Sequence, residues 1–205
     1  MKKLILITLI IALCSCAFAG LFEENQFLEA ELNLAKKPNI YFVFDLEKKM
    51  VEIKVRGTTL REFPIEGVRL WGSPPVVSYS KLIKKTALLK PKRKEIKPKK
   101  EKDSDEEQDT FQIEALELKD MPSSYKLLFD NGMRLLVSPK PEGFFGWIAH
   151  ALRTTLWYVV RPLESAINML LKRPFYALRI EVSKDDARRI YWAFPEGNEA
   201  ILYNP

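Results

Sequence analysis

The sequence predicts an α+β protein that is mainly β, with a meander or sandwich of strands, one long amphipathic helix and a C-terminal strand, helix and strand. Three observations predict this class. Apolar and polar side chains alternate over short stretches such as residues 51–55, which is the period of a half-buried strand. Residues 144–172 repeat their apolar side chains every three or four positions, which is the period of a helix. Residues 175–203 begin with the alternation of a strand, continue with the period of a helix and end in a short strand.

The first residues predict export. Two lysines precede an apolar run at 4–13, and Ala17-Phe18-Ala19 supplies a small-x-small cleavage pattern before Gly20. We therefore expect a signal peptide at 1–19. Residues 13–16, Leu-Cys-Ser-Cys, also resemble a bacterial lipobox, in which case 1–15 are removed and Cys16 is lipidated. Either way we expect a protein of the periplasm or cell envelope, which in the second case is lipid-anchored.

Cysteine content and charge limit the chemistry. Cys14 and Cys16 are the only cysteines, so the mature chain has no disulfide, thiolate nucleophile or cysteine metal site. Loss of the two signal lysines lowers the net charge from +6 to +4. In an exported protein this balance favours anionic lipid or a cell-wall polymer as partner, and we expect no nucleic acid. Because the sequence has no phosphate loop or dinucleotide motif, we also expect no cofactor.

After a lead-in segment at 20–38, whose helical or extended state the sequence leaves open, residues 39–205 are expected to form one β-rich domain. Strands are predicted at 40–44, 51–55 and 58–65, with a polar turn after the first and Gly57 in the second turn. A further strand is expected at 111–118. The clearest hairpin joins 125–129 to 133–137 through Asp130-Asn131-Gly132.

A charged segment at 84–109 interrupts this domain. It contains ten Lys or Arg up to residue 102, followed by an acidic block, and no aromatic residue. Such a segment cannot bury enough apolar surface to offset its ordering entropy, so we expect a disordered surface loop. The alternative is a basic tract that docks on anionic lipid or wall polymer. Its residues would be Lys92, Arg93, Lys94, Lys97, Lys99 and Lys100.

The helical segment 144–172 has one apolar arc and continues through Pro162, as one kinked helix or as two. We expect the apolar arc to pack on the sheet and close the core. A second interpretation starts from Trp147 and Trp157, which lie on or near the polar side with basic residues. Such a helix is typical of one that lies at a membrane surface.

The C-terminal stretch carries a resemblance to a known family. Its strand contains Leu178-Arg179-Ile180, Ser183 and Asp186 form a near capping box, and Pro195-Glu196-Gly197 ends the helix before a strand at 200–203. This order resembles the end of the L,D-transpeptidase (YkuD-like) catalytic domain, and the strands at 39–67 resemble its start. The resemblance implies an L,D-transpeptidase-like β-sandwich.

The chemistry of that family is missing from this chain. Matching Arg179 to the arginine of the family's motif places Ala177 where the nucleophilic cysteine would lie and Phe175 where the histidine would lie. Arg179 would then keep at most a structural or ligand-orienting role. His150, the only histidine, is expected on the polar face of the helix, and it cannot form a catalytic pair or a metal site alone. The acidic candidates are explained by turns and a helix start, and they are Asp45, Asp130, Asp185 and Asp186.

Three functions follow from these observations. The first is a non-catalytic cell-envelope module that contacts peptidoglycan or an envelope protein. The second is a membrane-peripheral protein that acts through its basic tract and amphipathic helix. The third is a hydrolase that uses carboxylates.

Overall fold

A computed structural model describes residues 20–87, 120–141, 143–172 and 174–205, and these fall into two compact units. Of the described residues, the first unit takes 20–64, 73–81 and 198–205, and the second takes the rest, from 65–72 and from 82 to 197. Hydrogen bonds join nine strands in the order β3-β2-β1-β9-β5-β6-β7-β8-β4. Strand β5 (Val77–Ala87) contributes its first part to one unit and its second part to the other. The α+β class is confirmed.

The first unit contains the predicted meander. Strands β1 (Ile40–Asp45), β2 (Met50–Val55) and β3 (Thr58–Pro64) pair in antiparallel order. Strand β9 (Glu199–Tyr203) lies parallel to β1, and the beginning of β5 pairs with β9 in antiparallel order. Asp45 supports the first turn, because its carboxylate accepts a hydrogen bond of 2.8 Å from the backbone N–H of Lys48. The last strand of the chain therefore completes the sheet that the first strand begins.

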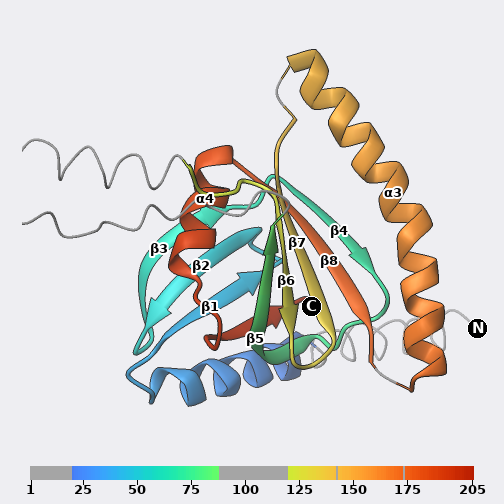
Figure 1. Ribbon diagram of the computed structural model, residues 1–205. Helices are drawn as coiled ribbons and strands as arrows, with labels where there is room; N and C mark the ends of the chain where they lie inside the picture. The colour runs from blue at the N-terminus through green and yellow to red at the C-terminus, as the bar shows by residue number, and fades with distance from the viewer. Residues whose placement is uncertain (1–19, 88–119, 142, 173) are drawn as a thin grey trace, which may run out of the picture. The chain divides into compact units, whose positions relative to one another are not determined.

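The lead-in segment forms a helix at residues 20–35, drawn in blue in Figure 1. Its buried side chains Phe27 and Leu34 join a core cluster with residues of β1 and β9. Phe27 stacks at a tilt on Tyr203, with ring centroids 4.6 Å apart. This packing decides the state that the sequence left open, since burial of a few large side chains stabilises a helix of this length.

The second unit is built around the predicted hairpin. Strands β6 (Tyr125–Phe129) and β7 (Met133–Pro139) pair in antiparallel order, and Gly132 takes a positive φ of 84° at their turn. Strand β8 (Tyr176–Val182) lies parallel to β7, and β4 (Gly67–Trp71) pairs with β8 in antiparallel order. Parallel neighbours need a long crossover, and helix α3 (Gly143–Leu170) provides it as a single helix through Pro162.

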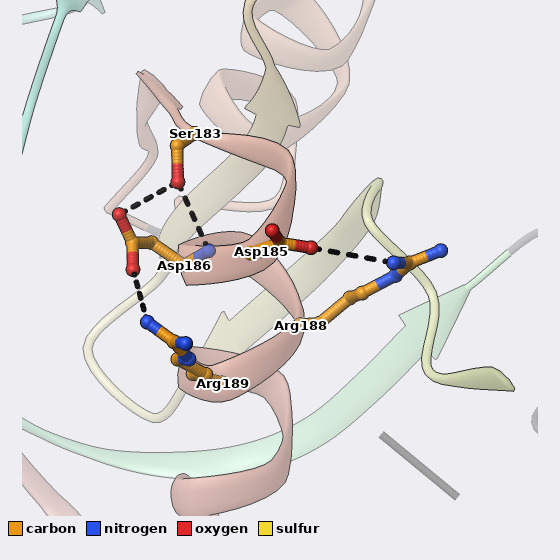
Figure 2. Close-up of polar contacts among 5 residues, drawn as sticks. All are labelled: Ser183, Asp185, Asp186, Arg188 and Arg189. Atoms are coloured by element: carbon orange, nitrogen blue, oxygen red, sulfur yellow. Dashed lines mark hydrogen bonds and ion pairs between the residues drawn. The ribbon is translucent and has the colours of Figure 1, made fainter. Parts of the chain in front are cut away.

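Helix α4 (Lys184–Ala193) begins at the predicted cap, which Figure 2 shows. The Ser183 hydroxyl accepts a hydrogen bond of 3.1 Å from the backbone N–H of Asp186 and donates one of 2.6 Å to the Asp186 carboxylate. Asp186 also pairs with Arg189 at 3.3 Å, and Asp185 pairs with Arg188 at 3.4 Å. The acidic first turn complements the positive end of the helix dipole. The predicted helix start is confirmed.

Some boundaries differ from the sequence prediction. Strand β5 continues to Ala87, so the first residues of the segment predicted as a loop from residue 84 are strand, because they pair with β6. Strand β4 and the beginning of β5 were not predicted. The signal peptide, the basic tract and the strand expected at 111–118 lie outside the described residues.

None of the helices described by the structure is long and apolar enough to cross a membrane.

Candidate functional site

Helix α3 exposes its apolar side. Six of its aliphatic residues, spaced by three or four positions, are between 54% and 84% exposed, and we call them the apolar stripe: Leu152, Leu156, Val159, Leu163, Ile167 and Leu170. The expectation that the apolar arc packs on the sheet is therefore wrong for these residues. Trp147 is 63% exposed on the same helix.

The opposite side of α3 faces the sheet of the second unit, and it is polar. Thr154, Trp157, Arg161 and Glu164 follow one another at helical spacing, and both Trp157 and Arg161 are only 4% exposed. Figure 1 shows α3 beside β4 and β8, and hydrogen bonds join it to both strands. The helix therefore buries the side that a simple amphipathic pattern would leave in water.

The sheet explains this orientation, because the side chains that it offers to α3 are cationic. The pairing of β4, β7 and β8 places Arg69 and Arg134 on the same face as Arg179. Arg69 donates a hydrogen bond of 3.1 Å to the Thr154 hydroxyl, and Arg179 donates one of 3.5 Å to the same oxygen. Arg134 forms an ion pair of 2.6 Å with Glu164. An apolar helix face cannot form these contacts, and covering the arginines without partners would carry a large desolvation penalty.

Arg179 is fully buried, which limits what it can do. Its Nε donates a hydrogen bond of 3.3 Å to Ser138, and its guanidinium lies 3.4 Å from the Glu181 carboxylate. A charge buried to this extent carries a large desolvation penalty unless such partners compensate it. Arg179 thus connects β8, β7 and α3 inside the second unit.

The position where the resemblance would place a nucleophile is buried. Ala177 is 0% exposed in the described structure. At the other substituted position, Phe175 carries the guanidinium of Arg134 over its ring at 4.9 Å. The two positions are occupied by packing contacts.

The two tryptophans that the sequence grouped together lie in different environments. Trp147 is exposed, whereas Trp157 is buried under Arg161, whose guanidinium carbon lies 4.4 Å from the ring centroid. Only Trp147 is therefore available to a partner in this arrangement. The side chain of His150 and the residues from Lys92 to Lys100 lie outside what is described.

A basic hollow lies beside the sheet-facing side of α3. Its volume is about 200 Å³, and strands β5, β6 and β7 and helix α3 contribute its lining: Thr86, Lys126, Leu127, Leu128, Arg134, Leu135, Leu136, Arg161 and Glu164. Burial lowers the pKa of Arg161, the neighbouring Arg134 cation acts in the same direction, and Glu164 opposes both. The Nε of Arg161 is buried and has no hydrogen-bond partner among the described residues.

The sequence did not predict this hollow, because its cations come from three separate elements. The alternation of β6 and β7 places Lys126 and Arg134 on the same face, but only the packing of α3 adds Arg161. In the described parts of the chain, no group of acidic, histidine or cysteine side chains is arranged to hold a metal ion.

Comparison with known proteins gives no match, whether with protein-family models, curated proteins or solved structures. The resemblance to L,D-transpeptidases therefore stays a prediction that depends on the motif residues alone.

Proposed function

We propose that this protein is an exported, non-catalytic peripheral protein that binds the surface of an anionic membrane through α3. The observation that carries the proposal is the apolar stripe, which faces solvent while the polar side of the same helix is buried. Large apolar patches on a protein surface are typical of sites that bind a partner or a membrane.

The size of the stripe suits reversible binding. When about half of an aliphatic side chain is transferred out of water, the transfer contributes roughly 1 kcal/mol to the free energy of binding. The stripe as a whole then contributes on the order of 5 kcal/mol, which is comparable to one myristoyl chain. Such an anchor is marginal by itself, so a second attraction is needed for stable binding.

Charge supplies that second attraction and favours a membrane over an apolar protein surface. Apart from Arg161 and Glu164, which face the sheet, the segment around α3 carries more basic than acidic residues: Lys140, Arg153, Lys172 and Arg173 against Glu142. Each cation close to an anionic bilayer contributes about 1 kcal/mol.

Sedimentation with lipid vesicles tests the proposal. All proteins carry Cys16→Ser, so that no acyl chain supplies the anchor. We expect the full chain to sediment with vesicles that contain phosphatidylglycerol, and Leu156→Glu with Leu163→Glu to reduce the bound fraction at least tenfold. The matched control is Leu28→Glu with Leu60→Glu, because those leucines are 53% and 57% exposed outside α3. The first 19 residues are the same in every protein and cannot cause a difference.

Two outcomes would overturn the membrane proposal. One is equal sedimentation of the stripe variant and the control. The other is a concentration-dependent dimer in solution that only the stripe variant loses, because the stripe would then bind a second copy of the chain.

A second candidate keeps the cell envelope but takes peptidoglycan or an envelope protein as partner, in an L,D-transpeptidase-like fold. Its support is the position of Arg179 on β8 beside Ala177, in the order that the family resemblance requires. A pull-down with purified peptidoglycan tests it. Retention of the chain on peptidoglycan, unchanged in the stripe variant, would favour this candidate over the membrane.

A further inference from the structure

The basic hollow beside α3 has more positive than negative charge. Lys126, Arg134 and Arg161 line it with a single carboxylate, that of Glu164. Glu164 pairs with Arg134 at 2.6 Å and forms a shorter contact with Arg161. Because one carboxylate is shared by two guanidinium groups, it cannot neutralise both of them. The hollow therefore keeps an excess of positive charge that an anion would balance.

One hydrogen-bond donor of a residue that lines the hollow also lacks an acceptor. Arg161 is 4% exposed, and its buried Nε has no hydrogen-bond partner among the described residues. A buried donor without a partner costs free energy, so a ligand that supplies an acceptor there would be stabilised. Arginine presents several N–H groups in one plane, which matches the oxygens of a phosphate.

Leu128 and Leu136 give the same hollow an apolar part. The volume of about 200 Å³ is below the roughly 300–1,000 Å³ of pockets for drug-sized ligands. At about 30 Å³ for each water-sized group, it has room for a phosphate and a few carbon atoms. The hollow therefore suits a small anion with a short aliphatic part better than it suits an inorganic ion alone.

We propose that the basic hollow binds a phosphate group carried on a short aliphatic stem. The headgroup of an anionic glycerophospholipid and free glycerophosphate share this chemistry. The lipid form rests on the proposed function, because α3 would then bring the hollow to the level of the headgroups. The soluble form does not depend on membrane binding.

Calorimetric titration of the full chain carrying Cys16→Ser with sodium glycerophosphate tests the site directly. We expect Lys126→Gln and Arg134→Gln each to weaken binding about tenfold, as for loss of one charged hydrogen bond. Glu164→Gln should strengthen binding, since it removes the competing carboxylate. The control is Lys81→Gln, which changes an exposed lysine of β5 that does not line the hollow.

The expected effects of Arg134→Gln and Glu164→Gln on glycerophosphate affinity are opposite, and this distinguishes a binding role of these two residues from a structural role. If Arg134 and Glu164 only held α3 in place, both substitutions would weaken binding together. Binding of glycerophosphate that none of these substitutions alters, or no binding at all, would overturn the proposal.

Vesicles distinguish the two sources of phosphate. If Lys126→Gln and Arg134→Gln also lower the preference for phosphatidylglycerol over phosphatidylcholine vesicles, the ligand is the lipid headgroup. If they weaken only the glycerophosphate titration, the site takes a soluble phosphate ester. The stripe variant Leu156→Glu with Leu163→Glu should bind glycerophosphate normally, so failure of the membrane proposal and failure of the phosphate site give different results.

Discussion

The guanidinium of Arg161 lies over the indole ring of Trp157, with 4.4 Å between the guanidinium carbon and the ring centroid. Both side chains are buried, although they belong to a helix whose aliphatic residues are largely exposed. The pair lies on the side of α3 that packs against the sheet. Trp157 therefore stabilises the packing of the helix, whereas Trp147 is exposed to solvent.

Substitution of Trp157 by alanine should loosen α3. Loss of a buried tryptophan side chain costs about 3 kcal/mol and would also remove the ring under Arg161. Amide hydrogen exchange of residues 154–164 measures the effect, and their protection should fall while that of β7 and β8 is unchanged. Trp147→Ala is the matched control, because Trp147 is 63% exposed. It should change stability by less than about 0.5 kcal/mol. Equal effects of the two substitutions on exchange would contradict this assignment.

Arg179→Ala should strongly destabilise the second unit. The substitution leaves the Glu181 carboxylate, 3.4 Å from the guanidinium, without that partner in a largely buried place. Breaking one side of a buried pair costs about 3–5 kcal/mol. The double variant Arg179→Met with Glu181→Gln fills the volume without charge and should recover much of the loss. Denaturant unfolding measures each free energy. If the double variant is no more stable than Arg179→Ala, the ion pair is not the source of the effect.

Ala177→Cys should produce no acyl transfer. Position 177 is fully buried, so a thiol there cannot reach a substrate, and the position of the family's histidine holds Phe175. In a background with Cys14→Ser and Cys16→Ser, we expect the new thiol to react with a thiol reagent at least a hundredfold more slowly than one at Ser73→Cys, an exposed position. Transpeptidase activity of the single variant, or fast labelling of the folded protein, would show that position 177 is open.

Glu199 should make the first unit sensitive to acid. Burial alone would raise its pKa, but hydrogen bonds from Lys37 and Tyr79 outweigh burial and hold the pKa of Glu199 below its usual value of 4.5. Because the folded pKa is the lower one, this stabilisation is present above pH 4.5 and is lost as the pH falls through the folded value. The melting temperature of wild type should therefore exceed that of Glu199→Gln at pH 6, and the difference should shrink towards pH 3.

Glu62→Gln is the control for this titration, because Glu62 is exposed on β3. Its difference from wild type should stay nearly constant over the same range. A difference between wild type and Glu199→Gln that does not change with pH would contradict the assigned role of the Lys37 contact.

Much of the fold could be predicted because its signals are local. The alternation of the meander, the turn at Gly132 and the cap at Ser183 each depend on residues a few positions apart, and the structure contains all of them. The parallel pairings of β9 with β1 and of β8 with β7 could not be predicted in the same way. Such partners are distant in sequence, and the alternation of a strand does not name its neighbour.

By itself the sequence determined that a long amphipathic helix follows the hairpin, since the helical period of 144–172 is a property of that segment alone. Only the tertiary structure decided which side of that helix is buried. The sheet presents Arg69, Arg134 and Arg179 to it, so Thr154 and Glu164 turn inward and the apolar stripe remains in water. A hydrophobic pattern shows which face is apolar, but burial depends on what the opposite surface offers, and here that surface is cationic.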